Sequence, residues 1–73
     1  MESHKYELAV YWSAEDAVFV VDVPDLPGCM AHGSTPADAV RNAENAISLW
    51  IDTAREDGAR IPDPSARRAT IER

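Results

Sequence analysis

The stretch that most constrains the fold is residues 17–23, Ala-Val-Phe-Val-Val-Asp-Val. β-Branched residues fill most of it, which predicts a β-strand. Successive side chains of a strand point to opposite faces. Both of the resulting faces are largely apolar, one formed by Phe19, Val21 and Val23 and the other by Val18, Val20 and Asp22. Since a strand with one wet face alternates more cleanly between apolar and polar residues, we expect both faces to be covered.

Two further strands and one helix are predicted around this stretch. Residues 5–12 alternate as a strand, with Tyr6, Leu8, Val10 and Trp12 on one side. The polar residues 13–16 suit a turn that joins this strand to residues 17–23 as a hairpin. Residues 29–32 are expected to form a short third strand. Apolar residues then recur at steps of three and four over residues 36–57, which predicts an amphipathic helix.

The boundaries of these elements have clear local signals. The loop Pro24-Asp25-Leu26-Pro27-Gly28 ends the second strand, because proline cannot donate a ladder hydrogen bond and glycine can take a positive φ. Thr35 followed by Pro36 and Asp38 is typical of a capped helix N-terminus. Gly58 is a natural C-terminal stop for the same helix. We therefore expect a stiff, shaped loop followed by a well-defined helix.

The fold predicted from these elements is α+β, with a three-stranded antiparallel sheet and one helix packed on one face. Residues 1–73 are expected to form a single domain, with an extended, proline-rich segment at residues 59–73 that could add a short strand. This leaves too little sequence for a separate DNA-binding domain. Because one helix covers only one face, the second cover is expected to be another copy or another protein. The candidate self-association residues are Tyr11, Trp12, Val18 and Val20.

Charge is distributed unevenly along the chain. The net charge is −6, and residues 1–40 hold seven of the 13 acidic residues but one of the seven basic ones. An acidic field repels phosphate backbones and attracts basic partners, so we expect a basic protein partner and no direct nucleic-acid binding by this chain alone. Improved solubility is the simpler alternative explanation. No secretory signal and no membrane-length apolar run is visible, which favours a cytoplasmic location.

The sequence offers little for catalysis or cofactor binding. His4, His32 and Cys29 lack metal-ligand spacing, so no metal site and no cofactor are expected. A two-metal nuclease would need several converging carboxylates. The available acids, Asp22, Asp25, Asp38 and Glu44, have simpler structural roles in a strand, a turn, a helix cap and a solvated helix face. We therefore predict no catalytic residues and no enzyme activity.

Taken together, the motifs resemble the HicB antitoxin family. The resemblance rests on Lys5-Tyr6, the strand Phe19 to Val23, the run Pro24 to Cys29, Gly33-x-Thr35 with Ala39 in the first helical turn, and Gly58-x-x-Ile61-Pro62-x-Pro64-Ser65. It covers roughly residues 5–65, and the Pro-Asp-Leu-Pro-Gly-Cys run is its most specific part.

The resemblance implies a reduced RNase H-like core, homodimers or larger assemblies, and an antitoxin that binds and neutralises a small basic HicA-like toxin that cleaves messenger RNA. Candidate partner-binding or loop-shaping residues are Asp22, Pro24, Asp25, Leu26, Pro27, Gly28 and Cys29. Two alternatives stay open: a self-assembling HicB-like module without a toxin, and a metal-dependent nuclease.

Overall fold

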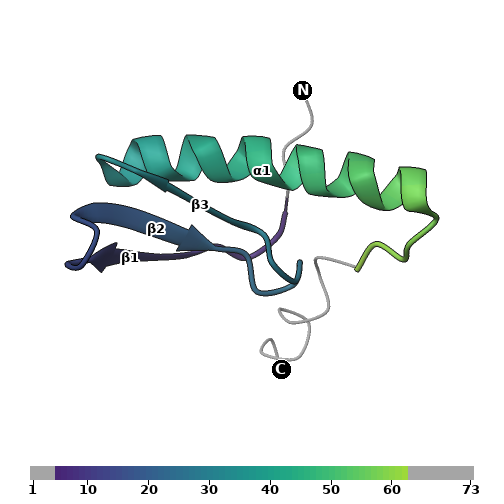
Figure 1. The fold of residues 1–73 in the computed structure, drawn as a ribbon, viewed down its shortest axis with the longest axis horizontal. Helices are drawn as coiled ribbons and strands as arrows, with labels where there is room; N and C mark the ends of the chain where they lie inside the picture. The colour runs from purple at the N-terminus through teal and green to yellow at the C-terminus, as the bar shows by residue number, and fades with distance from the viewer. Residues whose placement is uncertain (1–4, 63–73) are drawn as a thin grey trace.

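The computed structural model describes residues 5–62 and has the predicted β-β-β-α order. Its elements are β1 (Ala9–Ser13), β2 (Val18–Asp22), β3 (Met30–Gly33) and α1 (Pro36–Asp57). The strands form one antiparallel sheet in the order β1-β2-β3. The helix packs on one side of this sheet and runs alongside β3, away from β1 (Figure 1). The predicted α+β class is therefore confirmed. The expected extended segment at residues 59–73 falls mostly outside the described residues.

The hairpin of β1 and β2 is shorter than the sequence pattern suggests. The pairing runs from Ala9 opposite Asp22 to Ser13 opposite Val18. The ladder stops at Ala9 because β2 ends at Asp22, two residues before a proline. The turn between the strands is closed by the Asp16 backbone N–H, which donates to Ser13 Oγ at 3.4 Å.

The helix begins and ends at the predicted signals. Thr35 is its N-cap, and the Thr35 side chain accepts a hydrogen bond from the Asp38 backbone N–H at 3.1 Å. Gly58 ends it in the left-handed conformation, with φ of 72°. Its buried residues are Ala39, Ala43, Ile47 and Ala54. The N-terminal half of the helix thus presents small side chains to the sheet, which allows a close approach.

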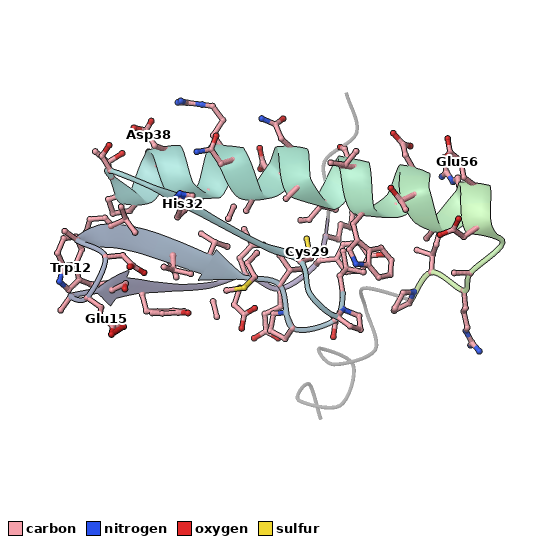
Figure 2. All side chains as sticks on the ribbon, in the orientation of Figure 1. Trp12, Glu15, Cys29, His32, Asp38 and Glu56 are labelled. Atoms are coloured by element: carbon pink, nitrogen blue, oxygen red, sulfur yellow. The ribbon has the colours of Figure 1, made fainter. Side chains whose placement is uncertain are left out.

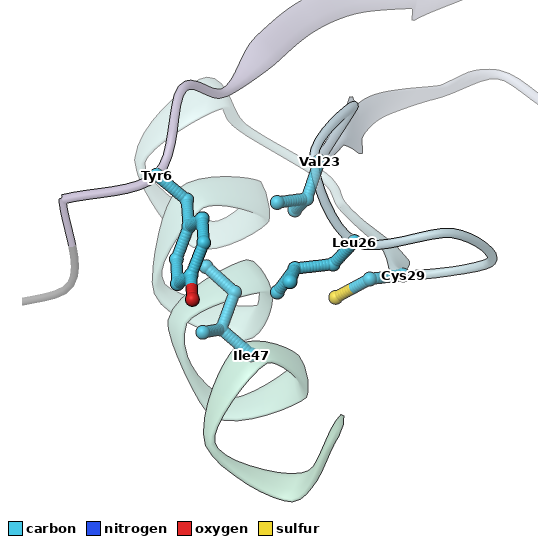
Figure 3. Packing of buried hydrophobic residues seen from close by; sticks show 5 residues of the cluster. All are labelled: Tyr6, Val23, Leu26, Cys29 and Ile47. Atoms are coloured by element: carbon cyan, nitrogen blue, oxygen red, sulfur yellow. The ribbon is translucent and has the colours of Figure 1, made fainter. Parts of the chain in front are cut away.

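The core consists of two neighbouring clusters between α1 and the sheet. The first contains Tyr6, Val23, Leu26, Cys29 and Ile47 (Figure 3). The second contains Val21, Ala39 and Ala43. The Tyr6 hydroxyl, at the border of the first cluster, donates to the Pro62 carbonyl oxygen at 2.7 Å. This bond joins the segment before β1 to the segment after α1, so both ends of the described chain are fixed to the core.

Within residues 5–62, no helix combines the length and the apolar composition that a membrane crossing requires.

Candidate functional site

One face of the sheet is left without a covering element in the described part of the chain. We call it the uncovered face. Strand register places three cross-strand rows on it, because directly opposed residues of antiparallel strands point to the same side. The rows are Ser13 with Val18, then Tyr11 with Val20 and His32, then Ala9 with Asp22 and Met30. Large apolar side chains from all three strands therefore lie on one surface.

The uncovered face is hollowed and has acidic residues near both ends. A shallow groove of about 490 Å³ is lined by Asp16, Val18, Val20, Met30, Ala31 and His32. Asp16 lies at the hairpin turn, and Asp22 lies at the opposite end of β2. A partner that contacts the apolar centre would therefore also meet carboxylates. This arrangement favours a partner surface that combines apolar and basic side chains.

Trp12 is separated from the other three candidate self-association residues. It lies opposite Phe19 on the helix-bearing face, whereas Tyr11, Val18 and Val20 lie on the uncovered face. The rings of Trp12 and Phe19 meet edge to face, with centroids 4.9 Å apart. Because α1 lies over β2 and β3, Trp12 extends past the helix at the hairpin end of the sheet (Figure 2). Strand alternation predicts this division between faces, but it does not show how far across the sheet the helix reaches.

The loop between β2 and β3 is built around two buried residues. Leu26 and Cys29 point into the first core cluster, whereas Pro24, Pro27 and Gly28 are exposed. Three backbone hydrogen bonds hold its shape: Val23 N–H to the Cys29 carbonyl, Leu26 N–H to the Val23 carbonyl, and Cys29 N–H to the Leu26 carbonyl. Leu26 and Cys29 thus combine core burial with backbone hydrogen bonds inside the loop, while Pro24, Pro27 and Gly28 face solvent.

Two further contacts position the loop and the third strand against α1. Trp50 Nε1 donates to the Pro27 carbonyl oxygen at 2.9 Å, and Asn42 Nδ2 donates to the His32 carbonyl oxygen at 2.9 Å. The hydrogen bond of Asn42 could not be predicted from the sequence, because the helix pattern places Asn42 only on the polar side. Asp25 Oδ2 is buried with no hydrogen-bond partner in the described part of the chain. A buried acceptor of this kind is unfavourable for folding.

The thiol of Cys29 is kept in its neutral form. Burial raises the pKa of Cys29 above its ordinary value of 9.0, and the carboxylate of Asp22 raises this pKa further. The folded protein therefore prefers the protonated thiol, while the unfolded chain ionises near its ordinary pKa. The contribution of the buried thiol to the free energy of unfolding is therefore fully present below about pH 9, and it declines as the pH rises above that value.

We predict slow alkylation of Cys29 by iodoacetamide at pH 8, at least about tenfold slower than in urea-unfolded chain, because the thiolate is the reactive form. Asp22→Asn should accelerate the reaction, since it removes one of the two causes of the raised pKa. The double variant Cys29→Ala, Leu49→Cys provides an exposed thiol in the same fold as a control. A native Cys29 that reacts as fast as this control would contradict the prediction.

The described residues do not assemble the side chains of a metal centre. No three His, Cys, Asp or Glu side chains between residues 5 and 62 lie close enough to hold an ion. Asp22 lies on the uncovered face, Asp38 follows the helix cap, and Glu44 is exposed on α1. The nuclease alternative therefore has no group of three or more metal-binding side chains in this part of the chain. His4 lies outside the described residues.

Three curated relatives show similarity over much of this chain. The chain is 37% identical to the UPF0150 protein Ta0767 of Thermoplasma acidophilum over 57 residues, which is 78% of this chain and 83% of the relative. It is 32% identical to the UPF0150 protein ssl0259 of Synechocystis over 66 residues, which is 90% and 89% respectively. A 14.9 kDa protein of Haemophilus phage HP1 is 46% identical over 44 residues, or 60% of this chain and 33% of the phage protein. No solved structure matches the chain.

Residues 6–73 match a family described as the HicB-like antitoxin of a bacterial toxin-antitoxin system. The match includes all three strands, the β2–β3 loop, the helix and the segment after it. The matched residues therefore include those of the uncovered face and those of the core beneath it. The chain belongs to the HicB-like antitoxin family.

Proposed function

We propose that this chain binds and neutralises a basic, HicA-like, RNA-cleaving toxin, and that the uncovered face is the contact surface. Family membership supports an antitoxin role in general. The observation that carries the assignment to this face is its apolar groove with Asp16 and Asp22 near its two ends. Pro24, Pro27 and Gly28 would border the contact, since their loop follows directly after Asp22. The encounter would take place in the cytoplasm.

The proposed mechanism is inhibition by occupancy and involves no chemistry by the antitoxin. Acidic residues near the groove would attract a basic toxin and accelerate encounter, an effect that weakens as salt concentration rises. Val18, Val20 and Met30 would then be removed from water, at roughly 25 cal/mol for each Å² of apolar surface buried. This apolar contact would slow release of the toxin. Charge would thus set the association rate, and apolar burial would set the lifetime of the complex.

Co-expression with a HicA-like toxin encoded beside this chain tests the function. The wild-type chain is expected to restore growth and to co-elute with the toxin in gel filtration. Val20→Lys, in the middle of the uncovered face, should lose rescue and weaken binding at least about 100-fold, because it places a cation against a basic partner and removes apolar contact. The matched control is Leu49→Lys, on an exposed apolar residue of α1, which should retain rescue.

The possible outcomes test the antitoxin function and the position of the contact surface separately. Absence of both rescue and complex with the wild-type chain would reject the antitoxin proposal and favour a self-assembling module without a toxin. Rescue that survives Val20→Lys but fails with Leu49→Lys would keep the function and move the contact from the sheet to the helix. Circular dichroism of both variants establishes that each comparison involves folded protein.

A further inference from the structure

Two sulfur-containing residues are neighbours in the sequence but lie in opposite environments. Cys29 belongs to the first core cluster and is only 4% exposed (Figure 3). Met30, the first residue of β3, is 52% exposed. Successive side chains of an extended chain point to opposite sides, which accounts for this difference. A reagent dissolved in water therefore reaches the thioether of Met30 far more readily than the thiol of Cys29.

Met30 lies where three grooves of the surface meet. It lines the groove of the uncovered face together with Val18 and Val20. It also lines two open grooves beside α1, one of about 460 Å³ that includes Trp50 and one of about 350 Å³ that includes Asn42. Of the residues that line these three grooves, only Met30 borders all of them. A chemical change in its side chain would therefore alter the surface that a partner of the uncovered face meets.

The neighbours of Met30 on the uncovered face are mostly apolar side chains or hydrogen-bond acceptors. Met30 lies opposite Asp22, whose carboxylate accepts hydrogen bonds and does not donate them. Val18 and Val20, which line the same groove, carry no polar side-chain atoms. Among the residues of this groove, His32 alone carries a side-chain N–H, and it lies two positions along the strand. An oxygen acceptor added to Met30 would thus have few donors nearby once water is excluded.

We propose that Met30 is a site of oxidation by peroxides, and that its sulfoxide form weakens the contact with the toxin. The thioether sulfur attacks one oxygen of hydrogen peroxide, and the O–O bond breaks as the S–O bond forms. The hydroxyl bound to sulfur then gives its proton to the departing hydroxide, which leaves as water. Sulfur loses two electrons, and the peroxide gains them. The product carries a polar, chiral sulfoxide in place of a flexible apolar side chain.

The effect on binding rests on the proposed function, because it concerns the same toxin contact. In the free chain the sulfoxide oxygen stays hydrated, since Met30 is exposed, so the fold should tolerate the modification. In the complex this oxygen would lose its water on a surface built around Val18 and Val20. Burial of a polar atom without a hydrogen bond is unfavourable, so oxidation should weaken toxin binding at least about tenfold.

Peptide mass spectrometry of the purified chain tests the site without any toxin. Treatment with hydrogen peroxide at about pH 6 favours the thioether, because the reactive form of cysteine is the thiolate. We expect one added oxygen on Met30, an unmodified Cys29 and an unchanged circular dichroism spectrum. Met1 lies outside the described residues and is distinguished by its own peptide. Oxidation of Cys29 before Met30, or no oxygen on Met30, would overturn the proposal.

Toxin binding tests the consequence of the modification. The chain is oxidised alone, the peroxide is removed with catalase, and untreated toxin is then added. Wild type should lose at least about tenfold in affinity, whereas Met30→Leu should show equal affinities before and after treatment. The matched control is the double variant Met30→Leu, Leu49→Met, which moves an exposed thioether to α1 and should take up oxygen without a change in affinity.

The results distinguish failure of this inference from failure of the proposed function. Unchanged or tighter toxin binding by the oxidised wild type would overturn the role of Met30, and so would an equal loss in the double variant. Absence of a complex with the untreated wild type would instead reject the proposed function and, with it, any effect of oxidation on toxin binding.

Discussion

Leu26→Ala is expected to lower the free energy of unfolding by roughly 3 kcal/mol, within the range of about 2–5 kcal/mol for buried leucine truncations. Leu26 is fully buried although it belongs to a loop, and it packs with Tyr6, Val23, Cys29 and Ile47 (Figure 3). A core this small rarely supplies more than about 3–5 kcal/mol. The substitution should therefore lower Tm by about 12–24 °C or leave the chain largely unfolded. Urea and thermal unfolding followed by circular dichroism measure the effect.

The matched control is Leu49→Ala, which removes the same atoms from a side chain that is 68% exposed. Surface substitutions usually change stability by less than about 0.5 kcal/mol, so this variant should unfold close to wild type. Similar losses in the two leucine variants would show that Leu26 does not anchor the loop to the core. A loss below about 1 kcal/mol at Leu26 would lead to the same conclusion.

Local sequence signals predicted the elements of this fold because each signal acts within a few residues. Alternation in β2 identified the two faces, and Thr35 and Gly58 marked the two ends of α1, where the structure shows a side-chain cap and a left-handed glycine. The strand boundaries were less accurate. β1 begins at Ala9, because its pairing stops where β2 ends at Asp22.

The lateral position of the helix could not be predicted from these patterns. An amphipathic stripe tells which side of α1 faces the sheet, but not which strands lie beneath it. That position depends on small residues that meet across the interface, Ala31 and Gly33 from β3 with Ala39 and Ala43 from α1. Because of this lateral position of the helix, the β3 edge is covered and Trp12 extends beyond α1. The small residues in β3 and in α1 indicate that each element can be approached closely. The sequence alone does not show that these two sets of residues contact each other.

Only part of the candidate site could be predicted from local patterns. The sequence identified the β2–β3 loop as shaped and grouped Val18 and Val20 on one face of their strand, and the register puts that face opposite the helix. It did not separate buried from exposed positions within the loop. Loop residues have no repeating period, so burial of Leu26 and Cys29 follows only from where the loop folds back under α1. Contacts with toxin or with a second copy stay predictions.

Gly33→Ala is expected to destabilise the fold by about 2–3 kcal/mol, as overpacking of a tight contact does. A Cβ at Gly33 would lie 2.6 Å from the backbone nitrogen of Ala39 and 2.8 Å from the carbonyl carbon of Asp38. These atoms belong to the backbone of the first helical turn and cannot rotate away as a side chain could. The N-terminal end of α1 must therefore move off β3, which would weaken the Asn42 hydrogen bond to His32 and expose Val21.

The matched control is Gly28→Ala, which also replaces a glycine but creates no steric clash. Gly28 has a φ of 80°, and a Cβ there would meet no atom within 4 Å. Its substitution should cost only about 1–2 kcal/mol, the usual penalty for a left-handed residue. Urea unfolding compares the two variants, and amide chemical shifts should change around Ala39 and Val21 only for Gly33→Ala. If Gly28→Ala proved the more damaging variant, or if those shifts stayed unchanged, the close contact of β3 with α1 would not determine where the helix lies.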